Sequence, residues 1–182
     1  MEKFDLYNYD RTLSGKTIER GNPVPDGYYR LVVVVLIFNS KGELLIQQRQ
    51  SYKKNWSNLW DVSSSGHVTA GETSQQGASR ELKEELGIDY DFSNTAPVMT
   101  LSFPHGFNDF YIIHKDLDAA KLQLLQEEVQ AAKWATKDEV FQMIDDGSFI
   151  PYNKGIVDFI FFQFDHQGTH TKSDWTVPVR NV

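Results

Sequence analysis

The chain has 182 residues, no cysteine and a formal net charge of −7 at pH 7. This length fits one domain of about 100 to 200 residues, and a hydrophobic content of 40% is enough to form a core. The lack of cysteine excludes disulfides, thiolate metal sites and cysteine nucleophiles. The acidic charge argues against duplex nucleic acid as a partner, and no apolar run reaches the roughly 18 residues of a membrane span. We expect a single cytoplasmic domain over residues 1–182, without a signal peptide or membrane anchor.

The first part of the chain predicts strands. Residues 1–27 mix charges, Gly21, Pro23 and Pro25 with short apolar runs, which is typical of an extension or a hairpin. The run YYRLVVVVLIF ends at Phe38, and a four-residue turn separates it from ELLIQQR, so we predict a buried hairpin. A continuously apolar strand is usually buried on both faces. Helices should therefore cover the sheet from two sides.

The clearest predicted helix covers residues 74–86. Thr73 and Gln76 have the spacing of a capping box, apolar residues recur at helical intervals, and Gly87 supplies a C-terminal stop. The remaining predicted elements are strands at residues 98–103, 109–115 and 130–134, and helices at residues 137–145 and 153–165.

Three carboxylates fall on one face of the predicted helix. Glu81, Glu84 and Glu85 are related by steps of three and four residues, so their charges repel. A hard divalent cation bound through the carboxylate oxygens would relieve that repulsion. Taken alone, three glutamates are more often a solvated acidic face than a metal site.

The residues around these glutamates favour the metal site. Residues 66–88 read GHVTAGETSQQGASRELKEELGI, which resembles the Nudix box in full. With average composition, a chance match in a chain of this length has a probability of roughly 10⁻⁷ or less. The matching positions are Gly66, Glu72, Arg80, Glu81, Leu82, Glu84, Glu85, Gly87 and Ile88.

The resemblance implies a fold and a metal site. The fold is an α/β (α+β) domain, an α/β/α sandwich with a central mixed β-sheet. Mg²⁺, or Mn²⁺, is bound by the Gly66 carbonyl and by Glu81, Glu84 and Glu85, with Glu72 near the metal. Arg80 is expected to hold the box carboxylates in place, the alternative being a contact to a substrate phosphate. Glu84, Glu85 and Arg80 thus belong to the expected catalytic set.

A glutamate outside the box is a further catalytic candidate. Members of this family often take a general base or an extra metal ligand from a loop before a late strand, and LLQEEVQAAKW offers Glu127 and Glu128. We favour Glu128, because a Glu-Val pair a few residues before a tryptophan is frequent in the family. A solvated acidic pair is the simpler alternative.

Residues 29–67 resemble isopentenyl-diphosphate isomerase and its hydrolase relatives. The isomerase reaction implies a cysteine and metal-binding histidines, but the expected cysteine is Ser65 and one expected histidine is Arg30. A serine hydroxyl has a far higher pKa than a thiol and cannot replace it without an activating partner. His67 matches a metal-binding histidine of the isomerase, but a single ligand does not make a metal site. We therefore expect His67 to line the site or to be an ordinary hydrogen-bonded loop histidine.

Substrate-binding candidates precede the box. Arg49, Lys53 and Trp56, with His67, are placed to steer phosphates and to stack on a base. A solvated loop anchored by the tryptophan is the alternative. Five more residues could approach a substrate but are more often surface or core residues, namely His105, His114, Phe103, Phe107 and Phe110.

Together these features predict a divalent-metal-dependent hydrolase that cleaves the pyrophosphate linkage of a nucleoside diphosphate joined to another moiety, X. Positioning and charge stabilisation should supply most of the catalysis. The partner is a small-molecule phosphoanhydride, and a homodimer is expected from family habit. Two alternatives remain, an isomerase-like enzyme acting on prenyl diphosphates and a nucleotide-sensing protein that does not cleave its ligand. Ser65 bears on the nucleotide-sensing alternative, because its side chain could crowd the substrate phosphate.

Overall fold

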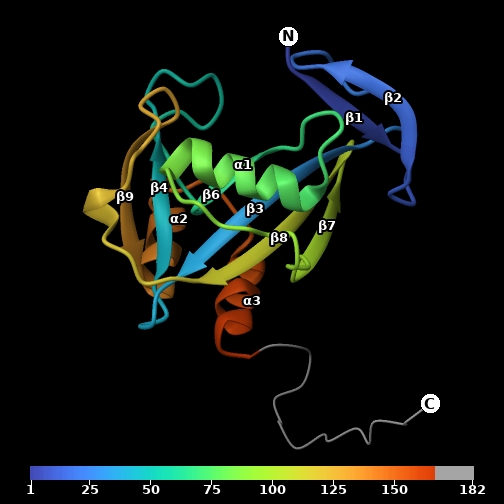
Figure 1. Cartoon of the computed structure of the whole chain (residues 1–182). Coiled ribbons are helices and arrows are strands. Elements are labelled where there is room, and N and C mark those ends of the chain that lie inside the picture. The colour runs from blue at the N-terminus through green and yellow to red at the C-terminus, as the bar shows by residue number, and fades with distance from the viewer. Residues whose placement is uncertain (167–182) are drawn as a thin grey trace, which may run out of the picture.

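The computed structural model describes residues 1–166, which form a curved mixed sheet between helices (Figure 1). The strands are β1 (Lys3–Tyr7), β2 (Leu13–Glu19), β3 (Arg30–Phe38), β4 (Leu44–Arg49), β5 (Trp60–Asp61), β6 (Ser64–His67), β7 (Met99–Phe103), β8 (Gly106–His114) and β9 (Val129–Ala135). The helices are α1 (Ser74–Leu86), α2 (Lys137–Asp145) and α3 (Lys154–Asp165), with a 3₁₀ turn, η1, at Ala119–Lys121. The predicted elements are confirmed, with ends displaced by up to three residues.

The main sheet has seven strands, and β3 lies at its centre. The path runs β5-β4-β3-β8-β7, with β6 paired to β3 and β9 paired to β4. β3 and β8 are parallel over their full length, from Arg30 opposite Gly106 to Phe38 opposite His114. The other pairs are antiparallel. The predicted mixed sheet is therefore confirmed.

The hairpin predicted between β3 and β4 is only partly correct. These two strands pair at a single position next to the turn, Phe38 opposite Leu44. Beyond this position β6 pairs with the same edge of β3, from Val32 opposite His67 to Val35 opposite Ser64. β4 instead pairs with β5 and β9. The sequence did not reveal β6 because its serines have little strand propensity.

Helices cover both faces of the sheet, as the apolar β3 run predicted. On one face α1 contributes Leu82 and Leu86 to a core that includes the odd-numbered residues of β3, such as Val35. On the other face α2 and α3 pack against the even-numbered residues of β3. Figure 1 shows α1 across the front of the sheet and α2 and α3 behind it. Alternation along an extended strand explains why one sequence run supplies both cores.

The N-terminal segment forms a separate two-stranded sheet, β1–β2. Arg11 attaches it to the main sheet, because its guanidinium donates two hydrogen bonds of 2.8 Å to the buried carboxylate of Asp109 in β8. A second attachment reaches the loop before α1, where the backbone N–H of Ala70 donates to the carbonyl of Lys3 at 2.8 Å. Of the extension or hairpin expected within residues 1–27, the structure shows a hairpin, and these contacts bring it beside the box.

Across residues 1–166, no helix combines the length and apolar character that crossing a membrane requires.

Candidate active site

α1 carries the box glutamates, and its ends form as the sequence predicts. The Thr73 side chain accepts a hydrogen bond from the Gln76 backbone while the Gln76 side chain accepts one from the Thr73 backbone, which completes the capping box. Gly87 ends the helix in the left-handed conformation, at φ 69°. The buried side of α1 fixes its rotation against the sheet. Its glutamates therefore project toward β6 and the loop that follows.

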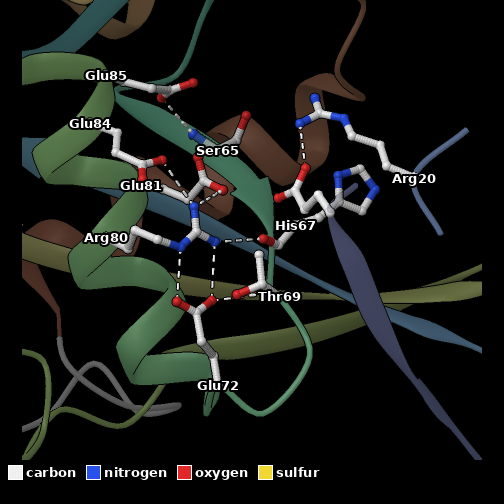
Figure 2. Close-up of polar contacts among 10 residues, drawn as sticks. Arg20, Ser65, His67, Thr69, Glu72, Arg80, Glu81, Glu84 and Glu85 are labelled. Atoms are coloured by element: carbon white, nitrogen blue, oxygen red, sulfur yellow. Dashed lines mark hydrogen bonds and ion pairs between the residues drawn. The ribbon is translucent and has the colours of Figure 1, made fainter. Parts of the chain in front are cut away.

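Arg80 is the centre of an ion-pair network (Figure 2). Its Nε donates to Glu72 at 2.9 Å, and its Nη1 donates to Glu81 at 2.9 Å and to Glu84 at 3.0 Å. Its Nη2 donates to the carbonyl of His67 at 2.9 Å and to Glu72 at 3.1 Å. One guanidinium thus holds three box carboxylates and the end of β6. These contacts leave Arg80 with no donor directed at a substrate phosphate.

The network changes the proton affinities of its members. Burial alone would lower the pKa of Arg80, but Glu72 and Glu81 outweigh it and raise that pKa. For Glu72 the effects are reversed. Burial would raise its pKa, but hydrogen bonds from Arg80 and Thr69 lower it below its ordinary value. The pKa of Glu81 stays raised, because its desolvation exceeds the attraction of Arg80. Glu72 is therefore held in its ionised form. At Glu81 the positive charge of Arg80 is not enough to offset the cost of burying the carboxylate.

Glu85 is the most deeply buried of the three glutamates on this face. Its carboxylate accepts hydrogen bonds from the Gln47 side-chain amide at 3.0 Å and from the Ser65 backbone N–H at 3.2 Å. Burial, with added repulsion from Glu81, raises the pKa of Glu85 to about 8. A buried carboxylate without a cation favours its protonated form. A positive charge placed beside it would restore the ionised form.

Gly66 allows β6 to approach this helix closely. A Cβ atom at position 66 would overlap the Glu81 carboxyl group and displace it from its present position beside Arg80. The close approach puts the Gly66 backbone beside a carboxylate on α1. A carbonyl and carboxylates in one place form the oxygen-rich set that Mg²⁺ and Mn²⁺ prefer.

A cavity of about 470 Å³ opens in front of these groups. It is lined by ten of the residues selected from the sequence, namely Arg49, Lys53, Trp56, Gly66, His67, Arg80, Glu81, Glu84, Glu85 and Glu128. Those residues come from β4, the loop after it, β6, α1 and the loop before β9. The sequence analysis therefore located the cavity, while the individual roles of its residues stay predictions.

Lys53 and Glu128 form an ion pair within the lining of the cavity. The pair joins two loops, one after β4 and one before β9. A backbone hydrogen bond of 3.0 Å from Gln50 N–H to the Glu128 carbonyl joins them again. Glu127 is exposed and outside the cavity lining, so the preference for Glu128 agrees with the geometry. Trp56, at 51% exposure, stands on the first of these loops.

His67 lies at the edge of the cavity with its ring buried. The ring stacks on Phe4 of β1 at 4.8 Å between centroids, and its Nε2 has no hydrogen-bond partner among the described residues. Burial, together with the charges of Arg30 and Arg20, lowers the pKa of His67 to about 4. The imidazole is therefore neutral at pH 7. The prediction of a residue that lines the site fits better than that of a hydrogen-bonded loop histidine.

Two pairs of polar lining residues were not found from the sequence. Glu2 and Arg20 flank the strands of the β1–β2 hairpin and form an ion pair of 2.7 Å. Figure 2 shows Arg20 beside His67. Asp61 and Tyr152 lie at the other side of the cavity, joined by a hydrogen bond of 3.0 Å. Neither pair has a local sequence signal, because each joins segments that only the tertiary structure brings together.

The remaining candidates lie away from the cavity. Phe107 and Phe110 belong to the two cores, and His114 stacks on Phe164 of α3. His105 and Phe103 line a different, shallower hollow. These positions agree with core or surface roles for all five residues.

In this arrangement the box glutamates do not form a ready-made metal site. Among residues 1–166 no group of three or more aspartate, glutamate or histidine side chains is already placed around a common metal position. The reason lies in the hydrogen bonds, since Arg80 draws Glu81 and Glu84 to itself while Gln47 holds Glu85. Small side-chain rotations would be needed to gather the oxygens around a cation.

Comparisons with known proteins define the class. Residues 28–153 match the NUDIX domain, and the chain belongs to the Nudix family. An uncharacterized Nudix hydrolase of Listeria monocytogenes is 47% identical over 152 residues, which cover 84% of this chain and 90% of that one. The crystal structure of DR0079 from Deinococcus radiodurans has a TM-score of 0.72 at 25% identity, covering 87% of this chain and 98% of that one.

The chain is accordingly a Nudix hydrolase, an enzyme that cleaves pyrophosphate bonds. Enzymes of this family generally use divalent metal ions. The similarity to the isomerases is also real but weaker. An isopentenyl-diphosphate Delta-isomerase of Citrobacter koseri is 27% identical over 143 residues, which cover 69% of this chain and 78% of that one.

Proposed function

We propose that this enzyme is a Mg²⁺- or Mn²⁺-dependent hydrolase of nucleoside diphosphates linked to a second moiety, X. The observation that carries the proposal is the cavity lining, in which Glu81, Glu84 and Glu85 share one cavity with the cations Arg49 and Lys53. A diphosphate needs positive charge along its length, and these two side chains supply part of it. We assign the rest to a bound cation, because the other two cations of the lining are paired with carboxylates, Arg80 with three box glutamates and Arg20 with Glu2.

The residues present fit a hard divalent cation. Glu81, Glu84, Glu85 and the Gly66 carbonyl offer oxygen ligands only, and the raised pKa values of Glu81 and Glu85 are those of carboxylates in need of positive charge. When bound, such a cation neutralises charge on the phosphate oxygens and makes a water molecule more acidic. The cysteine-free chain has no soft thiolate ligand, which favours Mg²⁺ or Mn²⁺ over soft metals.

Arg80 acts as the positioning residue of the proposed site. Its hydrogen bonds to Glu72, Glu81 and Glu84 orient these carboxylates before any ligand arrives. The contact to the His67 carbonyl fixes the end of β6 next to Gly66. Because Arg80 holds these carboxylates near one another, only small side-chain rotations are needed to gather them around a cation. In this role Arg80 supports the site without contacting substrate.

Glu128 is the proposed general base. It lines the cavity across from α1, on the loop before β9, and Lys53 holds its carboxylate in place. A base must reach the attacking water within hydrogen-bond distance. An incoming phosphate would compete with Glu128 for Lys53, and would thereby free the carboxylate when the substrate is bound.

The proposal also covers location and assembly. The chain has no cysteine and therefore no disulfide that would need an oxidising compartment, and we place the enzyme in the cytoplasm as the default location. We expect a homodimer, and sedimentation velocity of the purified chain will test this directly.

A panel assay tests the proposed function. Purified enzyme is incubated with dinucleotides, nucleotide sugars, nucleoside triphosphates and prenyl diphosphates, each with Mg²⁺, Mn²⁺ or a chelator. We expect metal-dependent release of phosphate-bearing products from one nucleotide class, and no conversion of isopentenyl to dimethylallyl diphosphate. Tight binding without turnover on any substrate would instead support a nucleotide sensor. Isomerisation would support the prenyl-diphosphate enzyme.

A further inference from the structure

The cavity extends beyond the box glutamates to the β1–β2 hairpin. On that side its lining includes Glu2 and Arg20. Arg49 and Lys53, the cations proposed for the diphosphate, come from β4 and the loop after it. Figure 1 shows this loop and the hairpin at opposite ends of α1. The cavity therefore has positive side chains at two separate places.

Arg20 is presented to the cavity by a hairpin that is attached to the box. Its backbone N–H donates to the Glu2 carbonyl at 2.9 Å, and the Gly71 backbone N–H donates to the Asp5 carboxylate of β1 at 2.7 Å. The Arg20 side chain is 64% exposed, and its Nη1 donates to the Glu2 carboxylate at 2.7 Å. Exposed ion pairs contribute little to stability. An incoming anion can therefore replace Glu2 as the partner of Arg20.

A second arginine, Arg30, lies at the start of β3 and is half-buried. Among residues 1–166 its side chain makes no hydrogen bond or ion pair, and its Nε is buried. Val32, two residues further along β3, lines the cavity and is opposite His67. Side chains two positions apart on a strand share a face. Arg30 is therefore on the face of β3 that borders the cavity.

Arg20 and Arg30, which we call the hairpin-side arginines, act on the same imidazole. Their charges lower the pKa of His67, Arg30 more than Arg20, while Glu2 opposes them. A half-buried charge without a partner costs free energy. The chain as a whole carries a net charge of −7, so this excess of positive charge is a local feature. Such a feature beside an open cavity favours a negatively charged ligand.

A neutral group at this place would leave Arg30 without a counter-charge. An apolar chain offers no acceptor, and a hydroxyl offers no charge. A phosphate or a carboxylate supplies both, and its oxygens match the fork of N–H donors on a guanidinium. Residues 1–27 precede the matched NUDIX domain, so Arg20 belongs to a part of the chain outside that domain.

We infer that the hairpin-side arginines bind an anionic group at the end of X, at a site separate from that of the diphosphate. The substrate is then a diphosphate whose second moiety carries a further phosphate or carboxylate. Arg20 exchanges Glu2 for this group, and Arg30 gains the counter-charge that it lacks among residues 1–166. The inference rests on the proposed function, since it takes the cation-bound diphosphate to lie over the box glutamates.

Two non-hydrolysable probes that differ only in their end group test the inference apart from turnover. Both are esters of methylene diphosphonate, one with a phosphopropyl chain and one with a hydroxypropyl chain. Affinities are measured by calorimetry with Mg²⁺, and methylene diphosphonate itself serves as the reference. We expect the phosphopropyl probe to bind at least about tenfold more tightly than the hydroxypropyl probe, as for a gain of charge-assisted hydrogen bonds.

Substitutions locate this preference in the hairpin-side arginines. Arg20→Gln and Arg30→Gln should each reduce the ratio of the two affinities at least about fivefold and leave the affinity for the hydroxypropyl probe unchanged. Lys16→Gln is the matched control, because Lys16 is another cation of the hairpin, bonded to the Tyr28 hydroxyl and outside the cavity lining. It changes the net charge by the same amount and should leave the ratio unchanged. Arg20 is exposed, so its variant decides the matter if Arg30→Gln does not fold.

The stability of Arg30→Gln is a second readout, which separates binding from a structural role. The variant loses a half-buried charge that has no partner among residues 1–166, so without ligand its melting temperature should equal or exceed that of wild type. A lower melting temperature would mean that Arg30 is paired within the protein, and would overturn its assignment to a ligand.

Equal binding of the two probes by wild type would overturn the inference alone, and so would ratios in the folded arginine variants as high as in Lys16→Gln. Failure of wild type to bind methylene diphosphonate in a Mg²⁺-dependent manner would overturn the proposed function and the inference with it. The two failures are distinguishable, because the reference compound has no end group for the hairpin-side arginines.

Discussion

Two buried carboxylates in one cavity, Glu85 and Asp61, have opposite neighbours. Both accept one backbone and one side-chain hydrogen bond, and burial raises the pKa of both. Glu85 is repelled by two carboxylates, Glu81 and Asp61, whereas Asp61 has Arg49 Nη1 at 4.0 Å from its Oδ2. The comparison indicates that the Glu85 region lacks positive charge and suits a cation, whereas Asp61 already has a cation of the protein beside it.

The largest expected effect is at the helix. Glu84→Gln removes one ligand charge of the proposed cation site and leaves an isosteric amide, so metal-dependent turnover should fall by about 100-fold or more. Steady-state assays with Mg²⁺ measure the loss, and circular dichroism shows whether the fold persists. Full activity in a folded Glu84→Gln variant would remove this residue from the site.

Arg80→Lys should come next. A lysine ammonium cannot span the acceptors that the guanidinium joins on Glu72, Glu81, Glu84 and the His67 carbonyl. We expect kcat to fall by about 10- to 100-fold, the usual range for residues that orient metal ligands. The Mg²⁺ concentration for half-maximal activity should rise as well. A pure increase in the KM for the nucleotide would instead indicate a direct phosphate contact.

The pKa of Glu85 predicts how stability changes with pH. Its folded value of about 8 lies above its ordinary value of 4.5, so between these pH values the folded state holds a proton that the unfolded state releases. The free energy of unfolding of the metal-free protein should therefore fall as pH rises from about 4.5 to 8. Thermal melts with a chelator measure this slope.

Glu85→Gln is the control for that experiment. It removes the titrating group while keeping an acceptor for Gln47, and its melting temperature should change less with pH over the same interval. Added Mg²⁺ should stabilise wild type more at pH 8 than at pH 5, because the ionised carboxylate is the form that binds it. Parallel slopes for wild type and variant would assign the pH dependence to other groups.

The smallest expected effect is at the loop after β4. Lys53→Gln removes a cation from the cavity lining, and the KM for a diphosphate substrate should rise about tenfold, as for loss of one charged hydrogen bond. Lys54→Gln is the matched control, because Lys54 is exposed and outside the lining. Equal effects of the two substitutions would mean that only the overall charge of the loop matters.

The helix region could be predicted from sequence because its information is local. The capping box, the helical spacing and the glutamates all fall between Thr73 and Gly87, and the predicted bounds of α1 match the structure. Part of the cavity lining was also found from the sequence. Arg49, Lys53 and Trp56 were selected for their charge or ring just before the box, and Glu128 for a pattern frequent in the family, and all four line the cavity.

The contact between Asp61 and Tyr152 and the position of the β1–β2 hairpin could not be predicted in the same way. Asp61 and Tyr152 are 91 positions apart, and their hydrogen bond depends on how the segment before α3 packs beside β5. Arg20 reaches the cavity because contacts such as those of Arg11 and Lys3 attach the hairpin to the main sheet and to the loop before α1. Long-range contacts of this kind leave no periodic or compositional trace in the chain.

Metal-dependent turnover measured against free Mg²⁺ tests the central claim most directly. With the nucleotide substrate that the panel identifies, the wild-type enzyme should be inactive in chelator and regain full activity as Mg²⁺ is added, while Glu84→Gln should remain inactive across the same range. Turnover that persists in chelator, or that responds to Mg²⁺ equally in both proteins, would contradict the assignment of the box glutamates to a catalytic cation.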